Sequence, residues 1–175
     1  MSASRSWLRR AGRGTSADDS IITWSMAEGR RGSRWREVRA NDGAVISSLL
    51  LELDPRRRFS HLELATVVGL LTLHPEGDGS LHGNAVDATG VRHVVAVPWQ
   101  PDDLLLVAGS PISRAAASRR ADAPRHSGVA MGVVVAIDLT LVRRAIGRTE
   151  RAIDLDPNGL PAFADGQTWP LELED

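Results

Sequence analysis

The chain has no cysteine, no lysine and no tyrosine, and two phenylalanines among its 175 residues. Without cysteine it forms no disulfide bond, no thiol nucleophile and no thiolate metal site. The five tryptophans therefore carry nearly all of the aromatic surface. All 21 basic residues are arginine, which we attribute to the bias of GC-rich coding DNA rather than to a requirement of the surface.

Long apolar runs and an excess of one charge are also missing. No stretch of about 18 apolar residues is present, so we expect no transmembrane helix. The basic N-terminus lacks the apolar segment of a signal peptide, so we expect a cytoplasmic protein. The formal net charge is −1, which gives no global electrostatic case for nucleic acid or an anionic membrane as a partner. We expect no cofactor and no nucleic-acid partner.

The most informative segment is residues 67–112. Four short apolar runs are separated there by the turn sequences GDGS, DATG and QPDD. This pattern is typical of an antiparallel β meander. Similar runs precede it, and the NDG sequence at residues 41–43 is a strong hairpin signal because Asn and Gly tolerate positive φ.

These patterns predict a mainly β fold: an antiparallel curved sheet, as a β-roll or half-barrel, with one short helix. We place the helix near residues 112–120, where Ser110 or Ser113 would cap it and three alanines favour it. The continuous apolar run of residues 131–139 predicts a central strand. Residues 141–152 fit a strand or a helix, and we assign residues 20–175 to a single β-roll domain.

Residues 1–19 are rich in Ser, Gly and Arg and have little periodic apolar content. We predict that they form a disordered tail, because they cannot bury enough surface to become ordered. The alternative is an anchor to an anionic surface, with Trp7 and Leu8 beside Arg9 and Arg10.

Strict alternation assigns the side chains of each predicted strand to two faces. In residues 59–66 it places Phe59, His61 and Glu63 on one face, and Leu62 and Leu64 on the other.

In residues 91–99, alternation places His93 on an interior face with three valines and Trp99, and Arg92 on the opposite face. His93 is then either a core histidine with one hydrogen-bond partner or the polar point of a ligand cavity.

A cluster of histidines and acids lies across one predicted turn: His74, Glu76, Asp78 and His82. A hard or borderline metal accepts these ligand types. The turn could bring the two histidines together, but GDGS is a good turn without any metal. A metal site and a solvated hairpin loop therefore both stay open.

The sequence AGSPISR at residues 108–114 starts the predicted helix. Hydroxyls and free amides at a helix N-terminus can hold a phosphate, but Ser110 can equally cap the helix without any ligand. No G-x-S-x-G elbow surrounds either serine, so we do not predict a serine hydrolase. The arginine runs at residues 56–58, 119–120 and 143–144 are expected to be solvated loop and edge charges.

Several stretches resemble a bacterial family of glycolipid-binding proteins. They are TWSM with the following strand that holds Trp35, LTLHPEGDGSLHGNAV, HVVAVPWQPDDLLLVAGSPIS, and IDLDPNGLPAFADGQTWPLEL. The likeness spans residues 21–173 and rests on the order of strands and on turn chemistry; the family's tyrosines and the asparagine after its S-P motif are missing. The resemblance implies a spiral β-roll, similar to lipoprotein carriers, that curves around an apolar groove.

We therefore predict non-catalytic binding of an apolar or amphipathic ligand, a lipid or glycolipid, in the rolled sheet. Trp35, Trp99 and Trp169 are predicted to give flat apolar contact, and Arg92 and His93 to give polar contact. One alternative is a metal-binding protein or metalloenzyme that uses the histidine and acid cluster. The other is a ligand-free structural or interaction protein with a full core and an exposed strand edge.

Overall fold

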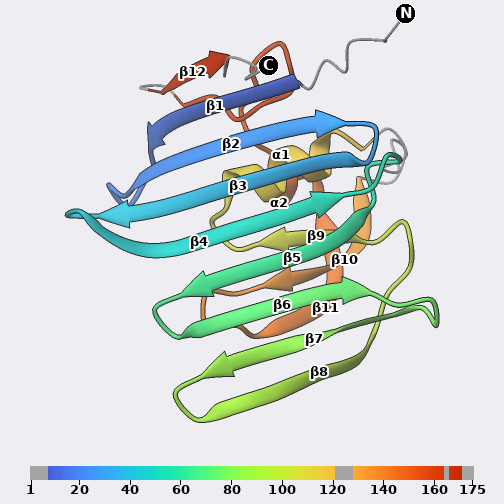
Figure 1. Cartoon of the computed structure of the whole chain (residues 1–175). Coiled ribbons are helices and arrows are strands. Elements are labelled where there is room, and N and C mark those ends of the chain that lie inside the picture. Colours follow the sequence, from blue (N-terminus) through green and yellow to red (C-terminus); the bar gives the residue numbers. More distant parts are fainter. Residues whose placement is uncertain (1–7, 121–127, 164–165, 171–175) are drawn as a thin grey trace, which may run out of the picture.

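The computed structural model describes residues 8–120, 128–163 and 166–170, without the side chains of residues 8, 9 and 167–170. The described residues form two sheets and two short helices (Figure 1). The strands are β1 (Leu8–Thr15), β2 (Ile21–Gly29), β3 (Gly32–Asn41), β4 (Ala44–Leu53), β5 (Phe59–Thr66), β6 (Gly69–Pro75), β7 (Ser80–Asp87), β8 (Gly90–Pro98), β9 (Leu104–Val107), β10 (Val129–Val135), β11 (Leu141–Gly147) and β12 (Gln167–Pro170). The helices are α1 (Pro111–Ser118) and α2 (Arg148–Arg151).

The larger sheet has nine strands in the order β12-β1-β2-β3-β4-β5-β6-β7-β8, and each neighbouring pair is antiparallel. The sheet is open, with β12 and β8 at its two edges. Its strands from β1 to β8 follow one another as hairpins, and the turn signals predict this order from β2 onwards. At the NDG turn, Asp42 and Gly43 have φ values of 47° and 80°. The predicted mainly β fold with a curved antiparallel sheet is confirmed.

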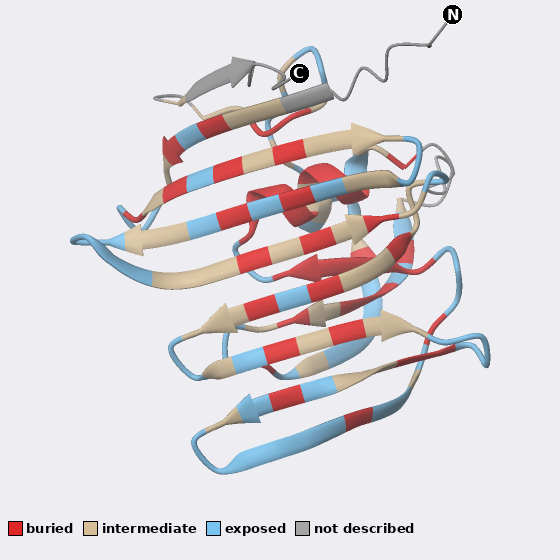
Figure 2. Ribbon diagram, in the orientation of Figure 1, coloured by how far each residue is buried: buried red, intermediate tan, exposed pale blue. Residues whose placement is uncertain are grey.

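Burial alternates along the central strands of this sheet (Figure 2). In β5, Leu62 and Leu64 are buried while Glu63 between them is exposed. One face of the sheet is therefore apolar and must be covered, whereas the other faces water.

A second layer covers the apolar face. It consists of α1 and a three-stranded sheet in the order β11-β10-β9, which lie on the same side of the large sheet (Figure 1). One core cluster joins Trp35 and Leu51 of the large sheet to Ile112 of α1 and Val133 of β10. The concave side of the curved sheet is thus filled by the chain itself.

The second sheet was not predicted. Its strands β9 and β10 are parallel, and α1 lies in the connection between them. Within it, β10 is the central strand, as the apolar run predicts. The ambiguous residues after it form β11 and then α2. Among the described residues, no helix is long and apolar enough to cross a membrane.

The prediction of a disordered tail is wrong for residues 8–15, which form β1 between β12 and β2. Two glycines explain both the prediction and the outcome. A Cβ on Gly12 would lie 2.5 Å from the ring of Trp24, and one on Gly14 would collide with the ring of Phe163. The aromatic rings therefore pack directly on a glycine-containing strand and replace the side chains that it lacks. Residues 1–7 lie outside the described part of the chain.

The predicted faces of β5 are wrong for Phe59. Its register with β4 shifts between Glu52 and Leu53, which pair with His61 and Phe59. This bulge inserts Ser60 and reverses the phase of the alternation. Phe59 is consequently buried on the same side as Leu62. Its ring packs edge to face on the ring of Trp99, with the two ring centroids 5.5 Å apart.

Candidate functional site

The two predicted ligand-binding tryptophans with described side chains are core residues. Trp35 of β3 is 1% exposed, and its Nε1 donates a hydrogen bond to Ser33 Oγ at 3.1 Å. The guanidinium of Arg119 lies 5.5 Å from the Trp35 ring centroid. Trp99 is 3% exposed and packs in the same cluster. Neither indole is open to a ligand in this packing.

The interior face predicted for β8 is wrong. Val91 and Val95 are 61% and 62% exposed, and His93 is exposed between them, whereas Val94 is buried. A register shift against β7 and a positive φ of 57° at Ala96 mark a bulge before Trp99. The bulge changes the phase of the strand, so Trp99 and His93 lie on opposite faces.

The polar residues of β8 lie at the open edge of the sheet. His93 Nδ1 lies 2.7 Å from Asn84 Oδ1 of β7, and Arg92 is exposed. Trp169 lies in β12 at the other edge, opposite Ala11, and its side chain is outside the described part of the structure. The five predicted contact residues are therefore spread over the core and both edges rather than brought together.

The histidine and acid cluster forms a solvated hairpin. His74 and His82 do pair across β6 and β7. However, His74 Nε2 lies 2.9 Å from Glu76 Oε1, and His82 Nε2 lies 2.9 Å from Ser80 Oγ. Across the described residues, no three His, Asp or Glu side chains are placed so that they could hold a metal ion.

The N-terminus of α1 is occupied by a carboxylate of the chain itself. Ser110, one of the two serines predicted as possible caps, is the N-cap, and its Oγ accepts a hydrogen bond from Ser113 N at 3.2 Å. Ser110 Oγ also donates to Glu37 Oε2 at 2.8 Å, and Ile112 N donates to the same oxygen at 3.3 Å. Glu37 projects from β3 and is 5% exposed. The helix N-terminus, where the sequence left a phosphate site and a simple cap as alternatives, is thus occupied by a carboxyl group of the chain itself.

Burial controls the ionisation of this carboxyl group. Desolvation raises the pKa of Glu37 above its ordinary value of 4.5, and the hydrogen bonds from Ser110 and Ile112 oppose this shift less strongly. Nearby Arg39 also favours the ionised form.

An open groove of about 520 Å³ lies where the turn between β1 and β2, the start of α1 and residues 152–163 meet. We call it the α1 groove. Its apolar walls include Ile22, Pro111, Ile153 and Phe163. Its polar side chains include Asp18, Arg39, Arg114 and Asp154.

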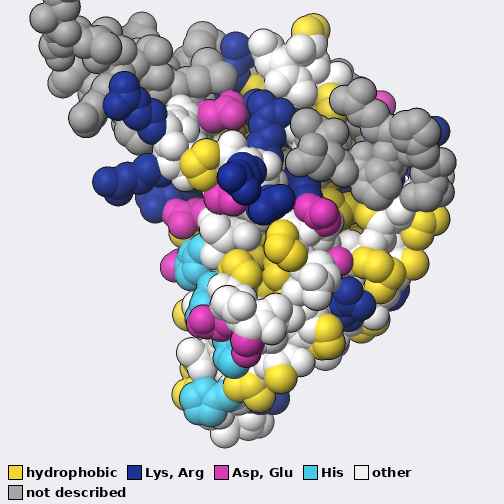
Figure 3. Space-filling model, turned by 90° about the vertical axis from the view of Figure 1, so that its right-hand side faces the viewer, with side chains coloured by type: hydrophobic (Ala, Val, Ile, Leu, Met, Phe, Trp, Pro, Cys, Tyr) yellow, Lys and Arg dark blue, Asp and Glu magenta, His cyan; other side chains and the backbone are white. Residues whose placement is uncertain are grey.

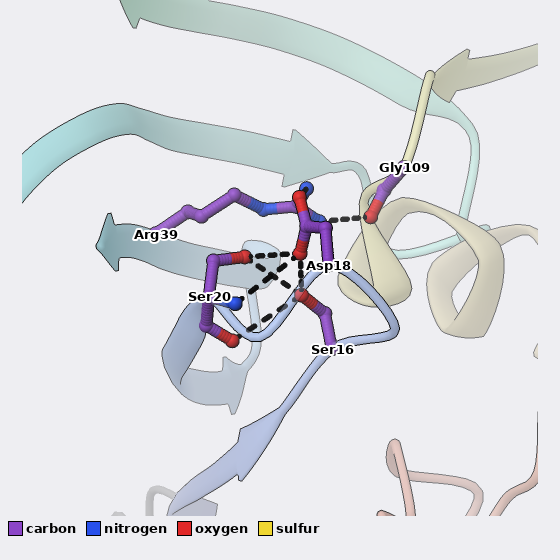
Figure 4. Close-up of polar contacts among 5 residues, drawn as sticks. All are labelled: Ser16, Asp18, Ser20, Arg39 and Gly109. Carbon is purple, nitrogen blue, oxygen red and sulfur yellow. Dashed lines mark hydrogen bonds and ion pairs between the residues drawn. The ribbon is translucent and has the colours of Figure 1, made fainter. Parts of the chain in front are cut away.

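One rim of the groove is fixed by a compact polar network (Figure 4). Arg39 Nη2 donates to Gly109 O at 2.5 Å, and Arg39 Nη1 lies 3.5 Å from Asp18 Oδ2. Asp18 Oδ1 accepts hydrogen bonds from Ser16 Oγ and from Ser20 Oγ, the latter at 2.6 Å. The hydrogen bonds from these hydroxyl groups hold the pKa of Asp18 well below its usual range, and the charge of Arg39 adds a smaller effect in the same direction. The network ties the turn before β2 to the segment that precedes α1.

Sequence reasoning did not single out Arg39 or Asp18. A signal for Arg39 was present, because it shares the inward phase of β3 with Trp35 and Glu37, and a charged residue on an apolar face needs a partner. Asp18 lies in the segment predicted to be a tail. Its partner Arg39 is 21 residues away, and no local pattern shows that contact.

The α1 groove offers a cationic side chain, an acceptor carboxylate and apolar walls in one depression. A depression with apolar walls and a few polar side chains is typical of small-molecule sites. When the chain is compared with protein-family models, with curated proteins and with solved structures, nothing matches it. The resemblance to the glycolipid-binding family therefore stays a prediction.

Proposed function

We propose that this chain is a non-catalytic binding protein for an amphipathic ligand, of the lipid or glycolipid class, and that the ligand binds in the α1 groove. The observation that supports this most directly is the groove itself. Its volume of about 520 Å³ falls in the range of about 300–1,000 Å³ that is usual for small-molecule sites. The proposal keeps the ligand class predicted from sequence and moves the site away from the filled interior of the sheet.

The two kinds of lining residue match the two halves of such a ligand. Ile153 and Phe163, which are half-buried, can cover an alkyl chain. Arg114 lines the same groove, and among the described residues it forms no ion pair or hydrogen bond through its side chain. Its guanidinium can therefore hold an anionic or oxygen-rich head group. Asp154 at the rim can accept hydrogen bonds from hydroxyl groups.

Arg39 is less suited to direct contact with the head group. It is already bonded to Gly109 O and faces Asp18, and its side chain is 14% exposed. We assign it the role of fixing the rim, so that the loop before α1 stays open beside Arg114.

The filled core also supports a second candidate, a ligand-free interaction protein. In that case the α1 groove is a surface depression without a ligand. An experiment on the purified full chain distinguishes the two candidate functions.

Native mass spectrometry followed by denaturing extraction would first show whether a molecule of defined mass copurifies. Titration with dodecanoate and with dodecyl maltoside, each below its micellar concentration, would then measure affinity. We expect binding of at least one probe, and a loss of about tenfold or more in dodecanoate affinity for Arg114→Gln, since a charged hydrogen bond contributes about 1.5–3 kcal/mol.

The matched control is Arg36→Gln, which removes the same charge from an exposed position of β3 outside the groove and should leave the affinity unchanged. If dodecanoate binds the two variants with equal affinity, the ligand does not bind in the α1 groove. An empty protein that binds neither probe would favour the interaction protein.

A further inference from the structure

The tertiary structure gathers arginines that are scattered in the sequence at one end of the molecule. Residues 28–34, 52–58 and 119–120 hold eight arginines and three carboxylates, although the whole chain has a net charge of −1. The turn between β2 and β3, the turn between β4 and β5 and the end of α1 meet at this end. Figure 3 looks onto it and shows Arg side chains gathered in its upper part, with acidic side chains among them.

The contacts between these segments leave a surplus of positive charge. Glu28 Oε2 lies 2.9 Å from Arg119 Nη2, and Glu28 Oε1 lies 3.9 Å from Arg57 Nη2. One carboxylate therefore serves two guanidinium groups.

Asp102 is likewise a single carboxylate that lies close to two arginine side chains. Its Oδ1 lies 3.3 Å from Arg120 Nη2 and 3.8 Å from Arg58 Nη2. With two guanidinium groups to one carboxylate, the Glu28 cluster has a net charge of +1, so the field beside it attracts anions.

A groove of about 510 Å³ lies at the same end, between the β2–β3 turn and the start of β5. We call it the hairpin groove. Arg31, Arg34, Ser33 and Ser60 line it, and Glu52 is the one carboxylate in its lining. Arg34 holds that carboxylate, with Nε 2.6 Å and Nη2 2.5 Å from Glu52 Oε1.

The remaining donors of the groove are available to a ligand. Arg31 is exposed and has no ion pair within the described ranges. Ser33 Oγ accepts its hydrogen bond from Trp35 Nε1, which leaves the hydroxyl proton free to be donated. Gly32, with φ of 110°, brings the turn against the carbonyl of Leu53, which fixes the backbone beside Arg31.

We propose that the hairpin groove binds a compact phosphate-type anion, held by the guanidinium of Arg31 and the hydroxyls of Ser33 and Ser60. A guanidinium fork with hydroxyl donors matches the geometry of a tetrahedral oxyanion. A nucleic-acid strand is less suited, because Trp24, Trp35 and Trp99 are buried and cannot stack on bases. The anion can belong to a soluble phosphate compound or to a lipid head group.

The two sources are separated by two probes applied to the full chain. Pyrophosphate is titrated by calorimetry, and cosedimentation is measured with vesicles of phosphatidylglycerol in phosphatidylcholine. We expect the wild type to bind at least one probe, and Arg31→Gln to weaken that binding about tenfold or more. Binding to pyrophosphate assigns a soluble ligand, and binding to the vesicles alone assigns a head group.

Matched variants make the result specific. Arg36→Gln removes the same charge from an exposed position of β3 outside the groove and should change affinity less than about twofold. Ser60→Ala keeps the charge and should weaken binding. Arg114→Gln, at the opposite end of β2, should have no effect, so this test does not depend on the α1 groove. Equal losses in Arg31→Gln and Arg36→Gln, or no binding of either probe, would overturn the proposal.

Discussion

Replacing Glu37 by glutamine and by alanine separates the hydrogen bonds of this buried carboxyl from its charge. Both bonds that it accepts from the start of α1, from Ser110 and from Ile112, end on Oε2. A glutamine amide oxygen can accept the same two bonds, whereas alanine accepts none. The donors are themselves buried, with Ser110 2% and Ile112 0% exposed.

The expected magnitude follows from those two donors. A buried donor left without a partner costs about 1–3 kcal/mol, so two cost about 2–6 kcal/mol in Glu37→Ala. Removal of the carboxyl also removes its own desolvation cost, which offsets part of the loss. We therefore expect the free energy of unfolding to fall by about 2–4 kcal/mol in Glu37→Ala, and to stay within about 1 kcal/mol of the wild type in Glu37→Gln near pH 5.

The difference between wild type and Glu37→Gln should depend on pH. Burial raises the pKa of Glu37 above 4.5, so the unfolded chain releases this proton at a lower pH than the folded protein. The wild type therefore loses stability from this group as pH rises from about 4.5 through the folded-state pKa. Glu37→Gln has no such loss. Its free energy of unfolding should therefore increase relative to that of the wild type as pH rises, up to a plateau.

Urea unfolding followed by tryptophan fluorescence measures all three proteins, because Trp24, Trp35 and Trp99 are buried in the core. The measurements should be made between pH 4.5 and pH 8. If Glu37→Gln loses as much stability as Glu37→Ala, or becomes relatively less stable as pH rises, the charge itself is required and the reasoning is refuted.

Two further pairs of variants test the packing by the same assay. Gly32→Ala should destabilise the protein by more than about 2 kcal/mol, because its φ is 110° and a Cβ would collide with Leu53 O; Gly43→Ala, with φ of 80° and open space, should cost only about 1 kcal/mol. Similar losses in the two variants would contradict this account of Gly32. Val94→Ala should cost about 2 kcal/mol and Val95→Ala less than about 0.5 kcal/mol, since the first is buried and the second exposed. If Val95→Ala costs more stability than Val94→Ala, Val95 faces the core, as the sequence predicted for β8.

The local signals of the sequence were sufficient for most of the elements, but not for β1. Alternation and turn residues located β2 to β8 and the NDG hairpin, and Ser110 marked the start of α1. These signals act within a few residues, where backbone φ, capping bonds and side-chain phase are decided. They failed where one inserted residue changed the phase, at Ser60 in β5 and at Ala96 in β8. A bulge is stabilised by pairing with the neighbouring strand, so a single strand read alone does not show it.

The candidate sites depended on contacts between distant residues. Glu37 and Ser110 are 73 positions apart, and Arg39 and Gly109 are 70 apart. The sequence by itself determined a mainly β chain of hairpins with one apolar face, because alternation and turn chemistry are local properties. Only the tertiary structure decided that a second layer fills this face, which leaves Trp24, Trp35 and Trp99 in the core and moves the candidate sites to the two ends of β2. The physical reason is that an apolar face must be covered, and the sequence does not state which distant segment covers it.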